Sequence, residues 1–371
     1  MNDWGREVPL KWIFLEMILQ KMKVANVNVT TYEKLNTIAG NKNIGIYQKR
    51  ELDEFLKTQH DIGNIIYFPS DKLKDYIIVN PKWLVQAFRC LISNKIDKKI
   101  KLTTDWGELI NTGKMTDTLF CQLLKKTSDY DFLENKSHLI EVLKQFDILV
   151  HLRNEGLSDH MYMPCIVKAG DLETVLKILG HTRTSWLCFE FDFLPPAFFN
   201  HIVVSFIKTY SVTEVLKDGK KELAIYRNYV VFDLVDTKDK KIILCVSKNI
   251  IGIQIWTSKN LFSVYTDALN MKTMVDGFIN RLKQKYSMGI KHTVTCKCDS
   301  PMFTNDRWEY SKVSWSDMRT GTYFCSNHCD NHSFYDVFYP WYQNDLTFVS
   351  SSQESNDKYN NKTTQHYPML S

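Results

Sequence analysis

The chain has 371 residues, a length that suits about two or three domains with hydrophobic cores of their own. Charged residues make up 24% and aromatic residues 13% of the sequence, which is typical of a folded protein and excludes a largely disordered chain. The net charge of +5 is spread over 43.6 kDa and therefore does not by itself indicate nucleic acid or a membrane as a partner.

The sequence predicts a cytoplasmic protein. Its first residues, MNDWGREVPLKWIF, lack the basic start and apolar stretch of a signal peptide. No apolar run approaches the roughly 20 residues that a bilayer-spanning helix needs. The nine cysteines are an odd number scattered along a large chain, and this pattern favours reduced thiols over a disulfide framework.

The first 92 residues follow a pattern that predicts a winged helix. Gly63 ends one helix, because glycine takes the left-handed conformation that a helix end needs. Asn80 caps the next helix, which has Pro81 at its first position and Trp83 buried near its start. Hydrophobic periodicity predicts helices over 8–24, 32–39 and 48–60 and strands over 65–68 and 77–79.

A second copy of this pattern follows. Helices are expected over 117–126 and 131–146, and strands over 147–152 and 161–163. Pro164 takes the place that Pro81 has in the first copy. We therefore predict tandem winged helices over residues 10–166, joined by a solvated lysine-rich linker at 94–101, within a subdomain bounded by 8–168.

From Ser185 the hydrophobic period changes to two, as strands require. Leu187, Phe189, Phe191 and Phe193 are expected on one strand face, which flanking helices leave partly uncovered. Strands are predicted over 223–234, 241–247 and 250–256, and helices from 194 and over 271–286. The predicted fold class is thus α+β, with an antiparallel α+β subdomain at 183–288.

Two stretches carry a resemblance to a known family. The first contains Asp61, Gly63 and Phe68, followed by Pro81 and the Trp83-Leu84 pair. The second contains LPPAFFNHIVVSF (194–206) and IYRNYVVFDL (225–234). These motifs resemble the two halves of the COR domain, the segment that follows the Roc GTPase in Roco proteins. The resemblance covers roughly residues 8–286, and the Roc domain itself is expected to be missing from this chain.

The resemblance implies a non-catalytic COR module that docks on a Roc-type GTPase domain, in cis or in trans, and that mediates dimerisation and scaffolding in signalling. It implies a homodimer, no nucleotide bound by this chain, and no contact with nucleic acid or membrane. One alternative is a winged-helix protein that binds nucleic acid. Another is a fragment of a larger Roco GTPase or kinase whose catalytic parts lie outside this chain.

The motifs of common enzymes are incomplete, and we therefore expect no catalytic residues. Gly40 and Gly45 have the spacing of a phosphate-binding loop, but Ile46-Tyr47 stands where Lys-Ser/Thr is required. The helix at 48–60 has balanced charges and that at 131–146 has a net charge of −1. A helix that approaches DNA phosphates should be clearly positive, so that charge disfavours the nucleic-acid alternative.

A small Cys/His-rich module is expected at 290–342, followed by a disordered tail at 343–371. Two groups of thiols and imidazoles in polar sequence suit a structural zinc ion, which takes four such ligands. The alternative is that they are ordinary thiols and surface histidines. The first choice of ligands is Cys296, Cys298, Cys325 and His328, with Cys329 or His332 as substitutes.

Overall fold

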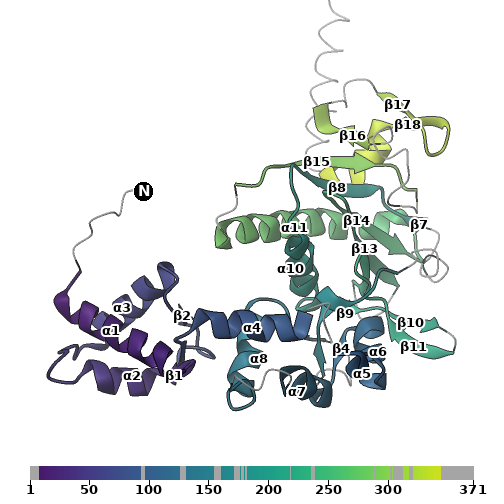
Figure 1. The fold of residues 1–371 in the computed structure, drawn as a ribbon. Helices are drawn as coiled ribbons and strands as arrows, with labels where there is room; N and C mark the ends of the chain where they lie inside the picture. The colour runs from purple at the N-terminus through teal and green to yellow at the C-terminus, as the bar shows by residue number, and fades with distance from the viewer. Residues whose placement is uncertain are drawn as a thin grey trace, which may run out of the picture. The chain divides into compact units, whose positions relative to one another are not determined.

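The structure, a computed structural model, describes residues 8–92, 97–125, 131–153, 160–170, 176, 179, 182–217, 219–234, 239–286, 289–300, 303, 312–316 and 321–343. The chain forms two compact units (Figure 1). The first contains residues 1–110 and 114–149, and the second contains residues 111–113 and 150–371. The predicted mixture of helices and sheets is confirmed. The expected tail at 343–371 lies, after residue 343, outside the described residues.

The first unit opens with short strands set among helices. In chain order these elements are α1 (Leu10–Val24), β1 (Val29–Thr31), α2 (Tyr32–Ala39), α3 (Lys49–Asp61), β2 (Ile66–Tyr67), β3 (Tyr76–Ile78) and α4 (Pro81–Ile92). The strands form an antiparallel sheet in the order β1-β3-β2. Leu15, Leu52, Phe55 and Ile77 are among the fully buried residues that join the helices to this sheet.

Local sequence signals explain these boundaries. The Thr31 side chain caps α2 by accepting a hydrogen bond from the Lys34 amide. Gly63 follows α3 with φ +77°, the left-handed conformation that the sequence predicted. The Asn80 side chain accepts a hydrogen bond of 3.2 Å from the Lys82 amide at the start of α4. The predictions for Gly63 and Asn80 are therefore confirmed.

The rest of the first unit contains two helices that the sequence reading missed. Its elements are α5 (Lys98–Lys101), α6 (Thr104–Thr112), β4 (Lys114–Met115), α7 (Asp117–Lys125) and α8 (Lys136–Gln145). The expected linker at 94–101 thus ends in a helical turn, while residues 93–96 lie outside the described part. The expected start of a helix at Asp131 is wrong by five residues, because residues 132–135 form turns before α8.

Trp83 is buried with 0% exposure, as predicted, and its contacts explain why Asp131 lies before α8 and not within it. Its indole Nε1 donates a hydrogen bond of 2.8 Å to Asp131 Oδ1, which also accepts one of 3.2 Å from Asn28 Nδ2. The indole lies against Phe132, with 5.3 Å between ring centroids. The turn that precedes α8 is therefore shaped by a polar contact with α4.

The second unit is built on one large antiparallel sheet. Its early elements are β5 (Val150–His151), β6 (Met161–Tyr162), the 3-10 turn η1 (Pro164–Ile166), β7 (Thr182–Arg183), β8 (Trp186–Phe191), α10 (Pro196–Ile207) and β9 (Ser211–Val212). Next come β10 (Glu214–Lys217), β11 (Lys220–Leu223), β12 (Tyr229–Asp233), β13 (Lys240–Ser247), β14 (Ile250–Thr257), η2 (Leu261–Val264) and α11 (Tyr265–Lys285). The last are β15 (His292–Lys297), β16 (Lys312–Ser314), β17 (Thr322–Cys325), β18 (Asp330–Ser333) and helical residues 334–343.

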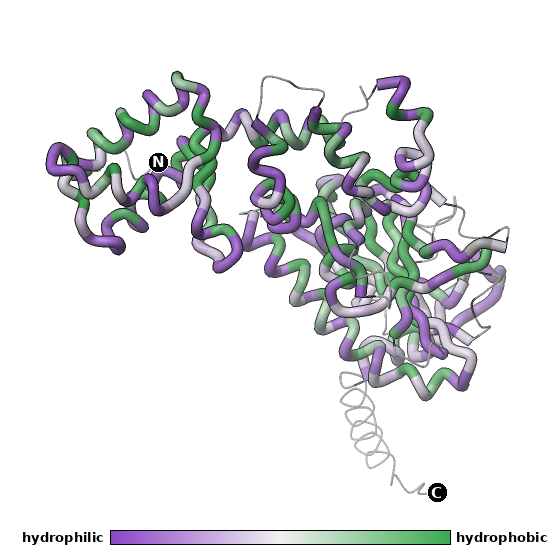
Figure 2. The backbone as a smooth tube through the Cα atoms, turned by 90° about the horizontal axis from the view of Figure 1, so that it is seen from below, coloured by the Kyte–Doolittle hydropathy of each residue, from purple (hydrophilic) through white to green (hydrophobic). Residues whose placement is uncertain are grey.

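The main sheet has the strand order β16-β15-β8-β14-β13-β12-β9, with β7 paired to β14. One face packs on α10, α11 and helical residues 334–343, as shown by Phe189, Phe206, Met271 and Trp341 in one core. The other face has its own core around Trp186, Tyr229, Ile243 and Trp256. Figure 2 shows hydrophobic residues gathered along these strands. The expectation of a partly uncovered strand face is therefore wrong.

Three further differences from the sequence reading concern this sheet. The strand expected over 223–234 is interrupted, since β11 pairs with β10 as a separate hairpin and β12 begins only at Tyr229. Phe193, expected on the buried face, lies beyond the end of β8 and is 62% exposed. The expected boundary near residue 290 falls inside the sheet, because β15 pairs with β8 over six residues.

Among the helices in the described part of the chain, none combines the length and the apolar character that a bilayer span requires.

Candidate functional site

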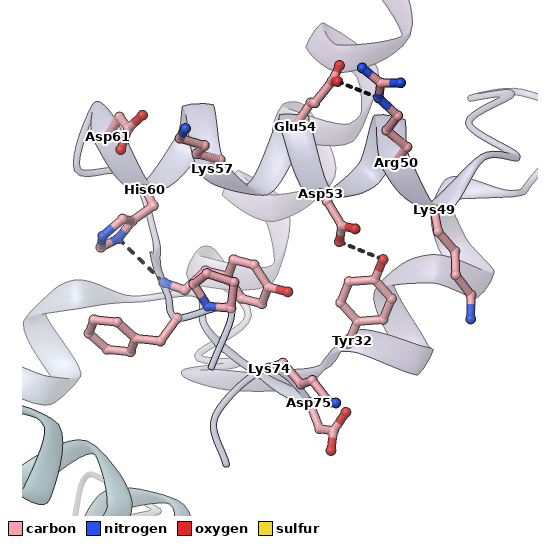
Figure 3. A pocket seen from close by; sticks show the side chains of 13 residues that line it. Tyr32, Lys49, Arg50, Asp53, Glu54, Lys57, His60, Asp61, Lys74 and Asp75 are labelled. Atoms are coloured by element: carbon pink, nitrogen blue, oxygen red, sulfur yellow. Dashed lines mark hydrogen bonds and ion pairs between the residues drawn. The ribbon is translucent and has the colours of Figure 1, made fainter. Parts of the chain in front are cut away.

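A pocket of about 770 Å³ lies in the first unit between α3 and the residues around β2 and β3 (Figure 3). Asp53 points from α3 toward Tyr32, whose hydroxyl donates a hydrogen bond of 2.9 Å to its carboxylate. His60 Nδ1 accepts a hydrogen bond of 3.5 Å from the Tyr67 amide. Burial, followed by the hydrogen bond to Asp53, raises the pKa of Tyr32 well above its usual value, so that the phenol stays a donor.

The charges of this pocket are balanced. Four basic side chains and four acidic side chains line it, namely Lys49, Arg50, Lys57 and Lys74 with Asp53, Glu54, Asp61 and Asp75. Arg50 and Glu54 form an ion pair of 3.2 Å along α3. A surface that holds a phosphate backbone needs an excess of positive charge. The balanced charge of this pocket therefore disfavours nucleic-acid binding through α3.

A second feature of the first unit is an apolar stripe on α1. Leu10, Ile13, Phe14 and Met17 follow the i, i+3, i+4, i+7 spacing of one helical face and are between 42% and 64% exposed. The opposite face of α1 packs into the core through Leu15 and Leu19. The helix is thus apolar on two sides, and only one of these is buried in this chain. Contiguous exposed apolar surface of this kind marks binding interfaces.

A third feature, in the second unit, gathers most of the predicted metal ligands. The sulfur atoms of Cys298 and Cys325 and a ring nitrogen of His328 all lie within 4.8 Å of one another. Cys325 Sγ is 3.6 Å from His328 Nδ1, and His328 Nδ1 is 3.0 Å from His332 Nε2. Asn327 donates a hydrogen bond of 3.5 Å from its side-chain amide to Cys298 Sγ.

The structure does not bring Cys296 to this cluster. Cys296 lies on β15 with 0% exposure, inside the hydrophobic core that also contains Trp341. Cys329, one of the substitutes, is exposed, and its thiol points to the Ser326 carbonyl at 3.8 Å. Burial raises the pKa of the Cys298 thiol to about 11.

His332, predicted only as a substitute ligand, also lies beside this cluster. It lies opposite Tyr323 in the β17–β18 hairpin, and Tyr323 is two residues before Cys325 on the same strand. Directly paired residues share a face of the ladder, as do residues two apart on one strand. The hairpin therefore presents Cys325 and His332 on one side. The sequence alone does not reveal this placement, because it depends on which residues of β17 and β18 pair.

All nine cysteines lie in the described residues, and none of them forms a disulfide. In the α3 pocket, the Nδ1 atom of the only lining histidine, His60, already accepts a backbone hydrogen bond.

Comparisons with known proteins identify the first part of the chain. A family profile described as "C-terminal of Roc, COR-A domain" matches residues 9–166. A comparison with curated proteins finds none that matches. Among solved structures, a chain titled "Structure of methanosarcina barkeri Roco2 RocCORdC bound to GDP" is similar, with 20% sequence identity and a TM-score of 0.34.

The alignment with that solved structure covers 45% of this chain and 46% of the other. This chain thus spans less than half of the length of that relative. The profile match contains the Asp61, Gly63 and Trp83 positions from which the resemblance was inferred. Residues 9–166 therefore match the COR-A domain, which by its description lies C-terminal of Roc.

Proposed function

We propose that this chain is a non-catalytic COR module that docks on a Roc-type GTPase domain and serves as a scaffold in cytoplasmic signalling. The observation that carries the proposal is the COR-A match over residues 9–166, since this family is defined by its place after Roc. The GTPase domain acts in cis or in trans, and nucleotide is bound by that domain rather than by this chain.

The proposal includes tandem winged helices. The element order α1-β1-α2-α3-β2-β3 is that of a winged helix, and α6-β4-α7-α8-β5-β6 repeats it along the chain. The sheet order β1-β3-β2 supports the first copy, because it places the two strands that follow α3 beside each other. In this reading the helices serve protein contacts, since the α3 pocket carries as many acidic as basic side chains.

We place the docking surface for the Roc-type domain on the α1 stripe. The COR-A match begins at residue 9, and α1 begins at Leu10. In a chain where a Roc-type domain precedes COR-A, that domain would be joined close to this helix, and the stripe would lie within its reach. Burial of Phe14 and Met17, now 42% and 53% exposed, supplies apolar area of the kind that anchors interfaces.

Titration calorimetry with a recombinant Roc-type GTPase domain loaded with GDP tests this placement. The double variant Phe14→Glu/Met17→Glu should bind at least about tenfold more weakly than the parent, because each carboxylate would have to be buried without a partner. Val85→Glu is the matched control, since Val85 is 55% exposed on α4. Equal affinities of the double variant and the parent contradict the placement, and no binding by the parent contradicts the docking function.

Self-association, implied by the COR resemblance, is the second part of the proposal. The second unit exposes apolar side chains outside its covered sheet, including Phe193 at 62% and Phe262 at 77%. Single exposed residues are common, and they support an interface only together with the resemblance. Light scattering at tens of micromolar protein is expected to give twice the mass of the chain. A monomeric mass at every concentration removes dimerisation from the proposal and leaves docking untouched.

A further inference from the structure

We propose that Cys298, Cys325, His328 and His332 bind one zinc ion as a structural site. The proposal is independent of docking on a GTPase domain. Three of these residues already lie within 4.8 Å of one another, and the fourth lies 3.0 Å from His328. Two thiolates and two imidazoles are a common ligand set of structural zinc.

One of the two separations between donor atoms lies within the range of a tetrahedral zinc site, and the other is slightly shorter. Zinc bonds of the usual lengths place neighbouring ligand atoms about 3.3 to 3.8 Å apart. The distance from Cys325 Sγ to His328 Nδ1 is 3.6 Å, and that from His328 Nδ1 to His332 Nε2 is 3.0 Å. The His332 ring stacks on Tyr323, with 5.9 Å between the ring centroids.

The backbone prepares the site. The Cys329 amide donates a hydrogen bond of 2.8 Å to the Cys325 carbonyl, and Cys329 has φ +55°, so that the chain turns back directly after His328. This turn places His328 over Cys325 while the hairpin pairing brings His332 to the same side. The Asn327 amide donates to Cys298 Sγ, as partners of metal-bound thiolates do.

The burial of the thiols also fits a metal. Cys298 and Cys325 are 1% and 0% exposed, although the hairpin around Cys325 is polar and its strands are exposed or half-buried at most other positions. Two thiolates neutralise Zn²⁺, so that a bound ion adds no net charge to this buried place. Since Cys298 follows β15 and the other three ligands belong to the hairpin, the ion would fasten β17–β18 to the end of the main sheet.

Metal analysis of the full chain tests the site. After dialysis with a reductant, mass spectrometry should find about one zinc per chain in the parent and in Cys329→Ser. Cys329 is the matched control because its thiol is exposed and points away, to the Ser326 carbonyl. Cys325→Ser and His332→Ala should each lose the zinc or hold it at least about tenfold more weakly. His332→Ala leaves both buried thiols in place and thus keeps the test independent of core damage.

Cobalt(II) titration of the metal-free chain provides a second readout. The parent should show visible bands of tetrahedral cobalt and a near-ultraviolet thiolate-to-cobalt band, and His332→Ala should change the visible bands. A parent that holds no zinc while circular dichroism and protease resistance show an ordered hairpin overturns the proposal. A Cys298–Cys325 disulfide in the purified protein also overturns it. Full zinc retention by His332→Ala, with loss in Cys329→Ser, excludes this ligand set.

Discussion

Trp83 offers the sharpest test of how the COR-A part is held together. Its side chain is fully buried in α4, and its indole Nε1 lies 2.8 Å from Asp131 Oδ1. Trp83→Ala removes the packing against Phe132 and leaves a cavity. We expect a loss of about 3–5 kcal/mol in the free energy of unfolding, the usual cost of a large-to-small change in a core.

A second substitution separates packing from hydrogen bonding. Trp83→Phe keeps an aromatic ring but removes the donor, so that Asp131 retains only its bonds to other partners, such as Asn28. This change should cost about 1–3 kcal/mol, the penalty for a half-buried acceptor that loses its donor. Asp131→Ala removes the acceptor. The loss of stability in the double variant should therefore be about 1–2 kcal/mol smaller than the sum of the losses in the two single variants.

Hydrogen exchange of α4 peptides across a urea series measures these losses within the first unit. Val85→Ala is the control, since Val85 is 55% exposed on the same helix and should change stability by less than about 0.5 kcal/mol. A Trp83→Ala loss as small as that of the control refutes the placement of Trp83 in the core. Strict additivity of Trp83→Phe and Asp131→Ala refutes the contribution of the hydrogen bond.

The remaining predictions concern single residues, each measured by urea unfolding against the parent. Burial lowers the pKa of His138 from 6.5 to about 4. Between these two pH values the unfolded chain binds a proton that the folded chain does not, so that lowering the pH to 5 should reduce the free energy of unfolding by roughly 2 kcal/mol. This pH dependence should be absent from His138→Phe. Gly63→Ala should cost about 1–2 kcal/mol because of φ +77°, and a stabilised variant would contradict that backbone. Gly252→Ala should cost about 1–3 kcal/mol, because its Cβ would lie 1.9 Å from the Phe303 ring; an unchanged midpoint would show that the ring moves freely.

The sequence by itself determined the local structure and the resemblance to the COR domain. Gly63 ends α3 and Asn80 caps α4 because the torsion angles and side-chain bonds that they provide act within a few residues. The hydrophobic periods also placed α10 and β13 within one or two residues, since each period reports one face of one element. The COR motif was visible for the same reason, as its residues lie close together along the chain.

The tertiary structure decided what depends on partners far away in the sequence. Helix α8 begins later than predicted because Asp131 accepts a hydrogen bond from Trp83, 48 residues earlier in the chain. Helical residues 334–343 return to one face of the main sheet and help α10 and α11 to bury it, as the Trp341 Nε1 bond to Ser185 Oγ shows. His332 rather than Cys296 lies beside His328 because pairing within the β17–β18 hairpin, rather than spacing along the chain, selects which side chains meet.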